Sequence, residues 1–228
     1  MSKCKCLSAS ALKIIALVTM LTDHFGHILY YWMVKYNGYP QEIYTVLRAV
    51  GRISFPLYCF LLVEGFVHTK NLKKYFFNIG LFALISEIPY DIMVRYKPFN
   101  FSTWNIFFTL FAGLFTLYCT KKVKEGKILY VFGMIIPAVA AQYLGFDYGA
   151  WGVLLILVMY LVRQIPVTGT LVTTLALAVK QNMAFAAVIP MMMYNGEKGR
   201  LKMKYFFYAI YPIHIAVFTL IRYLLYGF

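Results

Sequence analysis

The strongest constraint on this chain is a series of long apolar runs separated by short polar segments. The runs fall at about 9–33, 44–67, 72–93, 104–120, 127–144, 148–163, 166–194 and 205–226. A helix needs roughly 20 mostly apolar residues to cross a bilayer, and most of these runs approach that length. Only 13% of the residues are charged, whereas a typical soluble domain carries about 25%. The sequence therefore excludes a soluble globular protein and predicts an integral membrane protein.

The apolar runs predict helices and exclude a barrel. A backbone exposed to lipid must satisfy its own hydrogen bonds, which only helices and closed barrels achieve. The alternating pattern of barrel strands is absent, and the run from Trp151 to Val162 is apolar on every face. We therefore predict an all-α, polytopic transmembrane helical bundle. It would form a single integral domain over residues 1–228 and cross the cell membrane several times.

The run at 166–194 has two interpretations. As one helix it would carry Lys180 in its middle, and as two helices each half would have only about 13 residues. One crossing would leave the basic loop Lys198–Lys204 outside, whereas two crossings return it to the cytoplasm, in agreement with the positive-inside rule. We therefore predict about nine membrane segments, of which the seventh and eighth are short. The N-terminus would be cytoplasmic and the C-terminus outside.

The formal net charge of +14 also has two interpretations. In a soluble protein it would suggest nucleic acid as a partner. Here most basic residues fall in loops predicted to be cytoplasmic, where they face anionic lipid. We therefore expect membrane lipids and no nucleic acid. Cys4 and Cys6 form a Cys-x-Cys without histidines nearby, so no metal site is predicted.

The first apolar run contains the densest set of ionisable residues, and such residues inside a span indicate function. Lys13 and His24 are eleven residues apart, so they share a helix face and lie about 16 Å apart along the axis. Asp23 and His27 are four residues apart and can form a pair of their own. We interpret His24 as functional because imidazole titrates near neutral pH. Lys13 could instead extend its charge toward the membrane surface.

The second run carries two arginines, Arg48 and Arg52, one turn apart before Pro56. Two guanidinium groups on one face can hold a polyanion such as phosphate. They could equally form ion pairs with Glu87 or Asp91, and the sequence does not decide between the two. Further along the same run, Glu64 and His68 are also one turn apart, and we interpret them as a structural pair.

Later spans contain further candidates. Glu87 and Asp91 stand four residues apart around Pro89. Paired carboxylates can perform acid–base chemistry, although a salt bridge with the nearby Arg95 is the favoured interpretation. A second histidine, His214, follows Pro212 in the last run, where functional and structural roles are equally supported. Three more candidates stand where later spans begin and could simply cap helices; they are Asn105, Asp147 and Tyr148.

Seven segments resemble the TraX family, integral membrane proteins named for the conjugal transfer protein that N-acetylates pilin. In chain order they are LKIIALVTMLTDHFG, GRISFPLYCFLLVEGFVHTKNLKKY, FALISEIPYD, NIFFTLFAG, DYGAWGVLLI, YNGEKG and FYAIYPIHI. More distantly, the spacing from Lys13 to His24 resembles the basic-x10-His signature of the acyltransferase-three superfamily. FYAIYPIHI is similar to the SYxLYxxH segment of that superfamily. In that signature the basic residue is more often arginine.

This resemblance implies an enzyme that uses acyl-CoA as co-substrate and a catalytic histidine in the first helix. Acetyl-CoA would enter from the cytoplasm, with Lys13, Arg48 and Arg52 as its candidate ligands. His24, with Asp23 close by, suits a base that deprotonates the acceptor. His214 is a further catalytic candidate. Asn105 and Tyr148 are candidate oxyanion donors.

The leading hypothesis is therefore an acetyl-CoA-dependent acetyltransferase that acts on an amine, such as the N-terminus of a peptide or pilin. One alternative is an O-acyltransferase for an envelope glycan or lipid. A second is a proton-coupled transporter with Asp23, His24, Glu64 and Glu87 as its relay. The sequence leaves open the acceptor, a homodimer, and whether an acyl-histidine forms.

Overall fold

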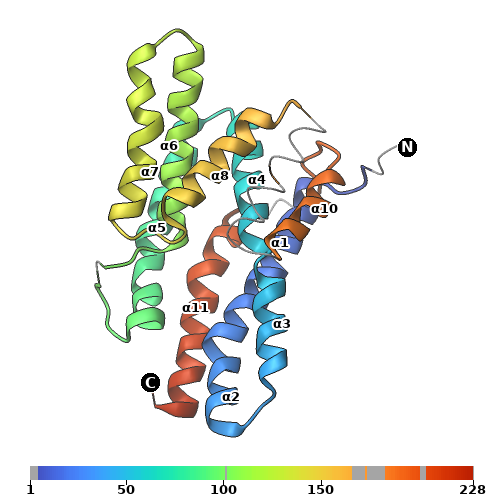
Figure 1. Cartoon of the computed structure of the whole chain (residues 1–228), viewed down its shortest axis with the longest axis vertical. Coiled ribbons are helices and arrows are strands. Elements are labelled where there is room, and N and C mark those ends of the chain that lie inside the picture. The colour runs from blue at the N-terminus through green and yellow to red at the C-terminus, as the bar shows by residue number, and fades with distance from the viewer. Residues whose placement is uncertain (1–4, 101, 166–172, 174–182, 201–203, 228) are drawn as a thin grey trace. The chain divides into compact units, whose positions relative to one another are not determined.

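The computed structural model describes residues 5–100, 102–165, 173, 183–200 and 204–227. Within these ranges every named element is a helix, which confirms the predicted all-α bundle (Figure 1). The chain divides into two compact units. Unit 1 comprises Met1–Leu61 and Thr173–Phe228, and unit 2 comprises Leu62–Val172. A single domain over the whole chain stays a prediction.

Five helices of the described chain are long and apolar enough to cross a membrane, so this is a multi-pass membrane protein. They are Ala9–Asn37, Gln41–His68, Leu72–Arg95, Ile106–Lys124 and Tyr205–Tyr226, and two shorter apolar helices cover Ile128–Tyr143 and Gly149–Val162. These helices match the first six predicted segments and the last one. Of the predicted seventh segment only Thr173 is described, and the eighth is described from Met183 onward.

The first span of unit 1 is one continuous helix with a change of pitch in its middle. It consists of α1 (Ala9–His24), the π-helix η1 (Phe25–Tyr30) and α2 (Tyr31–Asn37). The hydroxyl of Ser8 caps its start by accepting a hydrogen bond from the Ala11 amide. At the other end, Gly38 adopts φ +67°, a left-handed conformation that glycine tolerates and that commonly ends helices.

The second span begins as α3 (Gln41–Gly51) and continues as α4 (Ser54–His68). α3 is antiparallel to the first span, because Gly51 lies beside Asp23 and Leu47 beside Gly26. The helix tightens between α3 and α4, where the Arg52 amide bonds to the carbonyl three residues earlier. Pro56 explains this break, since it has no amide hydrogen and its ring clashes with the carbonyl four residues before it.

The last span, α11 (Lys204–Tyr226), runs parallel to the first (Figure 1). Successive contacts along both helices establish this direction; they join Lys13 to Phe207, His24 to His214, Phe25 to Phe218, and Trp32 to Tyr226. The two helices therefore cross the membrane in the same direction. Their partners are about 190 residues apart in the chain, so this packing is a purely tertiary feature.

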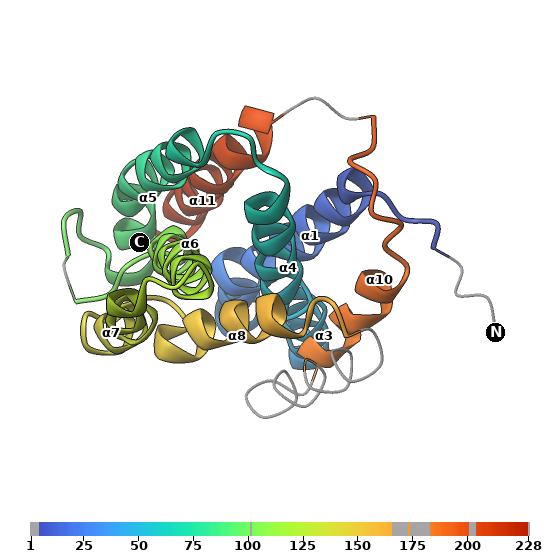
Figure 2. The same cartoon turned by 90° about the horizontal axis from the view of Figure 1, so that it is seen from above.

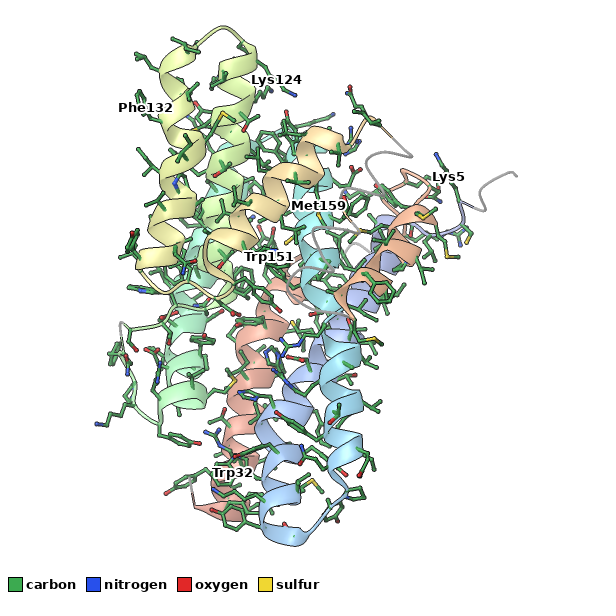
Figure 3. The ribbon with its side chains drawn as sticks, in the orientation of Figure 1. Lys5, Trp32, Lys124, Phe132, Trp151 and Met159 are labelled. Carbon is green, nitrogen blue, oxygen red and sulfur yellow. The ribbon has the colours of Figure 1, made fainter. Side chains whose placement is uncertain are left out.

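The segment that precedes α11 packs against the start of α1. Two short helices, η3 (Ala184–Ala187) and α10 (Val188–Met192), lead into it. Leu7 forms a parallel bridge with Tyr194, and the Ser10 hydroxyl donates to the Lys198 carbonyl at 2.9 Å. The basic loop around Lys198 thus lies at the N-terminal end of α1. Figure 3 shows Lys5 at that end of unit 1 and Trp32 at the opposite end.

Unit 2 is built around α6 (Ile106–Lys124), which contacts α5 (Leu72–Arg95), α7 (Phe132–Tyr143) and α8 (Gly149–Val162) (Figure 2). The short 3-10 helix η2 (Ile128–Val131) leads into α7. Small buried side chains at Ala112, Ala138 and Ala141 allow these helices to approach closely. This packing brings polar residues at the start of α6 against α5 and the loop before α8.

Candidate active site

Two histidines from opposite ends of the chain meet inside unit 1. The Nε2 atom of His214 lies 2.7 Å from Nδ1 of His24, and the two ring centroids are 4.8 Å apart. His214 is 4% exposed. Tyr211, one turn earlier on α11, packs edge-on against both imidazole rings. The first and last membrane helices therefore share a buried polar contact.

The hydrogen bonds of this pair assign its tautomers. Nδ1 of His214 lies 2.6 Å from the carbonyl oxygen of Ile210, and because a carbonyl only accepts, this nitrogen carries a proton. In a neutral His214 the Nε2 atom is then an acceptor. Nδ1 of His24 must donate to it, which leaves the lone pair on Nε2 of His24. The geometry thus presents one imidazole nitrogen as a base.

Asp23 is held by α3 and not by the residue one turn away on its own helix. Its Oδ2 atom accepts a hydrogen bond from Arg48 at 2.6 Å, whereas pairing with His27 was the sequence expectation. Gly51 packs directly on the carboxylate, and a Cβ atom there would collide with it. The other oxygen, Oδ1, is buried and has no hydrogen-bond partner among the described residues. The pair Asp23–Arg48 therefore fastens α3 beside His24.

The two predicted phosphate ligands in the second span differ in environment. Arg48 donates a hydrogen bond to Asp23, a carboxylate that differs from the expected partners Glu87 and Asp91, and phosphate binding by Arg48 stays a prediction. Arg52 is half-buried, and within the described ranges its side chain forms no hydrogen bond or ion pair. Lys13 lies over the ring of Phe207 at 5.6 Å. Lys13 and His24 thus both face α11, as their spacing predicts.

Sequence reasoning missed two features of this site. The first is the π-helix that begins immediately after His24; such bulges occur frequently at functional sites. The second is Gly51, whose missing side chain makes room for Asp23. The FGHILY segment gives no periodic signal for a π-turn. Gly51 lies inside the GRISFP motif and could have been singled out as a point of close helix approach.

A second polar cluster lies in unit 2, where α5 meets the start of α6. Asn105 donates from Nδ2 to Glu87 at 2.5 Å and to the Ala83 carbonyl at 2.8 Å. Its Oδ1 atom accepts from the Phe107 amide, so Asn105 is the helix cap that the sequence suggested. Both amide hydrogens are already used, which leaves neither for an oxyanion. Among the described residues, Glu87 is bound by this amide and by no cation.

The remaining candidates of unit 2, Asp91, Asp147 and Tyr148, each have a partner of their own. Asp91 is 1% exposed and accepts a hydrogen bond from the Asn100 amide at 2.7 Å. The backbone carbonyl of Asp147 accepts from the Thr109 hydroxyl. Tyr148 has φ +64° and stacks on Trp151. Its side chain makes no capping bond to α8, so it starts this helix by backbone conformation alone.

Glu64 and His68 form the structural group that their spacing suggests, with one additional partner. Arg163 donates from Nε to Glu64 at 2.6 Å, and Nη2 lies 3.5 Å from the second oxygen. His68 lies 3.7 Å from the same carboxylate, and its side chain is 58% exposed. Glu64 is thereby neutralised by Arg163, the residue that follows α8. Across the described chain, no three His, Cys, Asp or Glu residues gather in a way that could hold a metal ion.

A family model described as TraX protein matches residues 8–222. The chain belongs to the TraX family. The matched range includes both histidines and the three cationic candidates Lys13, Arg48 and Arg52. The matched range therefore includes the residues of the histidine site in unit 1 and those of the polar clusters in unit 2.

Two relatives of this TraX-family chain extend the comparison. The probable fimbrial assembly protein FimC, serogroup H1, of Dichelobacter nodosus is 29% identical over 240 residues, which cover 92% of this chain and 93% of the relative. The uncharacterized protein RP591 of Rickettsia prowazekii (strain Madrid E) is 24% identical over 150 residues, covering 66% and 52% respectively. No solved structure matches.

Proposed function

We propose that this protein is a membrane-embedded acetyltransferase that moves an acetyl group from acetyl-CoA to an amine, with His24 as general base. The observation that carries the proposal is the hydrogen bond between His24 and His214. An imidazole inside a span is costly and is retained chiefly for function. Here the imidazole of His214 fixes the tautomer of His24, as the orienting residue beside a catalytic base does.

The proton balance of amine acetylation fits this pair. As the acceptor nitrogen attacks the thioester carbon, Nε2 of His24 takes one of its protons. The carbon–sulfur bond then breaks, and the same proton passes to the leaving thiolate, so the reaction releases an amide and a free thiol. His214 cannot carry the proton away, because its Nδ1–H points at a carbonyl. His24 is therefore the catalytic residue, and His214 positions it.

The cationic residues support a place for the nucleotide end of acetyl-CoA. Arg52 and Lys13 lie in the two spans that meet at His24. The 16 Å that separates Lys13 from His24 along the helix, on the order of eleven residues at 1.5 Å each, suits a pantetheine arm. Arg48 holds Asp23 and has an indirect role. We propose that Lys13 and Arg52 bind the phosphates and that the thioester reaches His24.

The direction of the helices supports the membrane topology. The first and last spans are parallel, so the chain crosses the membrane an odd number of times. Its two ends then lie on opposite sides. The basic loop around Lys198 lies beside the start of α1, as expected for two segments on one side of the membrane. We propose that this side is the cytoplasm, because it carries most of the lysines. The C-terminus would then lie outside.

The relatives support a choice of acceptor class. The TraX family is named for a protein that N-acetylates pilin, and the Dichelobacter relative is called a probable fimbrial assembly protein. We propose a peptide N-terminus, such as that of a pilin subunit, as the acceptor. An O-acyltransferase would use the same base on a hydroxyl group, so only the acceptor distinguishes the two.

The test uses the full-length protein in lipid nanodiscs, labelled acetyl-CoA and a lysine-free peptide with a free N-terminus. His24→Ala should lower acetyl transfer by about 10²–10⁴-fold, the usual contribution of a general base, with acetyl-CoA affinity unchanged. His68→Ala is the matched control, since this histidine is exposed and lies in unit 2. Near-normal transfer by His24→Ala would refute the assignment. A transporter should bind no acetyl-CoA at all.

A further inference from the structure

A basic loop that the proposed mechanism does not use is attached to the start of α1. This 194–200 loop follows α10 and carries Lys198 and Arg200, which are two residues apart. Both residues are exposed, and within the described ranges neither side chain forms a hydrogen bond or an ion pair. A third exposed cation, Lys5, lies at the same end of unit 1 (Figure 3). Positive charge therefore gathers where the first span begins.

The backbone of the 194–200 loop is fixed to α1. The Ala9 amide donates to the Glu197 carbonyl at 2.8 Å. The amide and the hydroxyl of Ser10 both donate to the Lys198 carbonyl, at 3.2 and 2.9 Å. Gly199 adopts φ +77°, and a Cβ atom there would collide with the Ser10 side chain. A loop that only retained positive charge on one side of the membrane would need no such attachment, so these contacts indicate a preformed binding surface.

Among the described residues, no carboxylate of unit 1 forms an ion pair with these cations. The sequence of unit 1 contains three acidic residues, namely Asp23, Glu42 and Glu197. Asp23 binds Arg48, and Glu42 is exposed in the first turn of α3. Glu197 belongs to the loop itself, but its carboxylate accepts a hydrogen bond from Asn195 at 3.4 Å. The 194–200 loop thus presents a surplus of positive charge, which favours an anionic ligand.

The proposed function places the diphosphate of acetyl-CoA one helical turn from this loop. Lys13 follows Ser10, where the loop is attached, by three residues, or about 4.5 Å along the axis. In acetyl-CoA the diphosphate joins the pantetheine arm to a ribose, and this ribose carries a further phosphate on its 3′ oxygen. With the thioester at His24 and the diphosphate near Lys13, the ribose lies beyond Lys13, toward the 194–200 loop.

We propose that Lys198 and Arg200 bind the 3′-phosphate of acetyl-CoA. This inference rests on the proposed function and adds the group by which the co-substrate is selected. A phosphate monoester carries about −1.5 to −2 charges at pH 7, so it suits two cations. Arginine can bind such a group through two parallel hydrogen bonds, and lysine adds a compact charge. The 194–200 loop would thereby favour acetyl-CoA over compounds that lack this phosphate.

The experiment measures binding of CoA and of dephospho-CoA, which lacks only the 3′-phosphate, to the full-length protein in phosphatidylcholine nanodiscs. The wild-type protein should bind CoA about tenfold or more tightly than dephospho-CoA, as expected for hydrogen bonds to a charged group. Lys198→Gln and Arg200→Gln should each reduce this preference about threefold, and the double variant should abolish it. The Kd for dephospho-CoA should stay unchanged in all three variants. Arg200→Lys should keep part of the preference, because it keeps the charge.

Two further variants test whether the effect belongs to the loop. Lys121→Gln removes an exposed lysine of unit 2 and should leave the preference for CoA unchanged. Gly199→Ala keeps both cations, but its Cβ atom would displace the loop from Ser10, so it should lower the preference. The melting temperature of each variant, measured in the same nanodiscs, shows that the fold is retained.

Three results would overturn the inference. The first is equal binding of CoA and dephospho-CoA by the wild-type protein. The second is a preference for CoA that persists in the double variant. The third is stabilisation by phosphatidylglycerol that the double variant loses, without any preference for CoA, because the loop would then bind a lipid headgroup.

Binding and acetyl transfer are measured on the same samples, so the two proposals can fail separately. If the loop selects CoA but no acetyl group is transferred, the acetyltransferase proposal fails and the phosphate site stands. If His24-dependent transfer proceeds equally well from acetyl-CoA and from acetyl-dephospho-CoA, the phosphate site is wrong and the function stands.

Discussion

Replacing His214 tests the central geometry of the proposed site. The imidazole of His214 accepts a hydrogen bond from His24 at 2.7 Å, and this bond becomes charge-assisted when His24 takes a proton. A hydrogen bond to a charged group contributes about 1.5–3 kcal/mol. Since about 1.4 kcal/mol of barrier is tenfold in rate, His214→Ala should lower kcat by about 10–150-fold.

The assay is acetyl transfer from labelled acetyl-CoA to a peptide amine, with kcat and KM determined separately for each substrate. Because His214 acts through His24, the loss should fall on kcat and leave the KM for acetyl-CoA unchanged. The double variant His24→Ala/His214→Ala should be no slower than His24→Ala alone. Residues that act as one unit show this non-additivity, whereas two independent structural losses would multiply.

Two results would refute the reasoning. An unchanged kcat in His214→Ala would show that the hydrogen bond has no part in the reaction. A lower thermal stability with proportional loss of all activities, including acetyl-CoA binding, would assign the pair to packing between the first and last spans. His214→Gln offers a second variant if alanine unfolds the protein, because its side-chain carbonyl can still accept a hydrogen bond and should restore part of the rate.

Two further predictions concern the surroundings of the histidine pair, and a third concerns the ion pair of unit 2. Arg52→Gln should raise the acetyl-CoA KM about tenfold with the fold intact. Arg48→Gln should instead lower the thermal stability, because it leaves the Asp23 carboxylate buried without its partner. Equal effects of the two variants in calorimetry and kinetics would contradict their separate roles. Gly51→Ala should destabilise the protein by about 1–3 kcal/mol, since its Cβ atom would collide with Asp23, and an unchanged melting temperature would show that α3 shifts freely. Glu64→Gln should lower the melting temperature through loss of the Arg163 bridge, at a cost of about 1–3 kcal/mol because Arg163 is partly exposed to solvent, yet leave the acetyl-CoA KM unchanged; a change in KM would place this group at the cofactor.

The sequence predicts the helices well because each span must be apolar over most of its length. It also predicts that Lys13 and His24 share a face, since eleven residues at 100° each return to nearly the same direction. Both do contact α11. The cap at Asn105 is predictable for the same reason, because capping depends on local sequence alone.

The choice of partners could not be predicted. Asp23 has a histidine one turn away, yet it pairs with Arg48, because the π-turn after His24 changes the register and Gly51 admits the carboxylate. Likewise, Glu64 gains Arg163 from a helix almost 100 residues away. A sequence of apolar spans does not say which spans touch, so polar contacts between helices become visible only in the folded structure.

The membrane setting explains why a base in this protein would be paired with a neutral imidazole. A carboxylate in the position of His214 would be charged throughout the catalytic cycle, and a buried charge is expensive when no substrate is present. Acetyl transfer from a thioester to an amine consumes no net proton, so the base holds its proton only briefly. A neutral partner stabilises the imidazolium for that interval and leaves the resting pair uncharged. Asp23, the residue before His24, is held by Arg48, which balances its charge within unit 1, so that in the proposed reaction His24 is the group that accepts the proton.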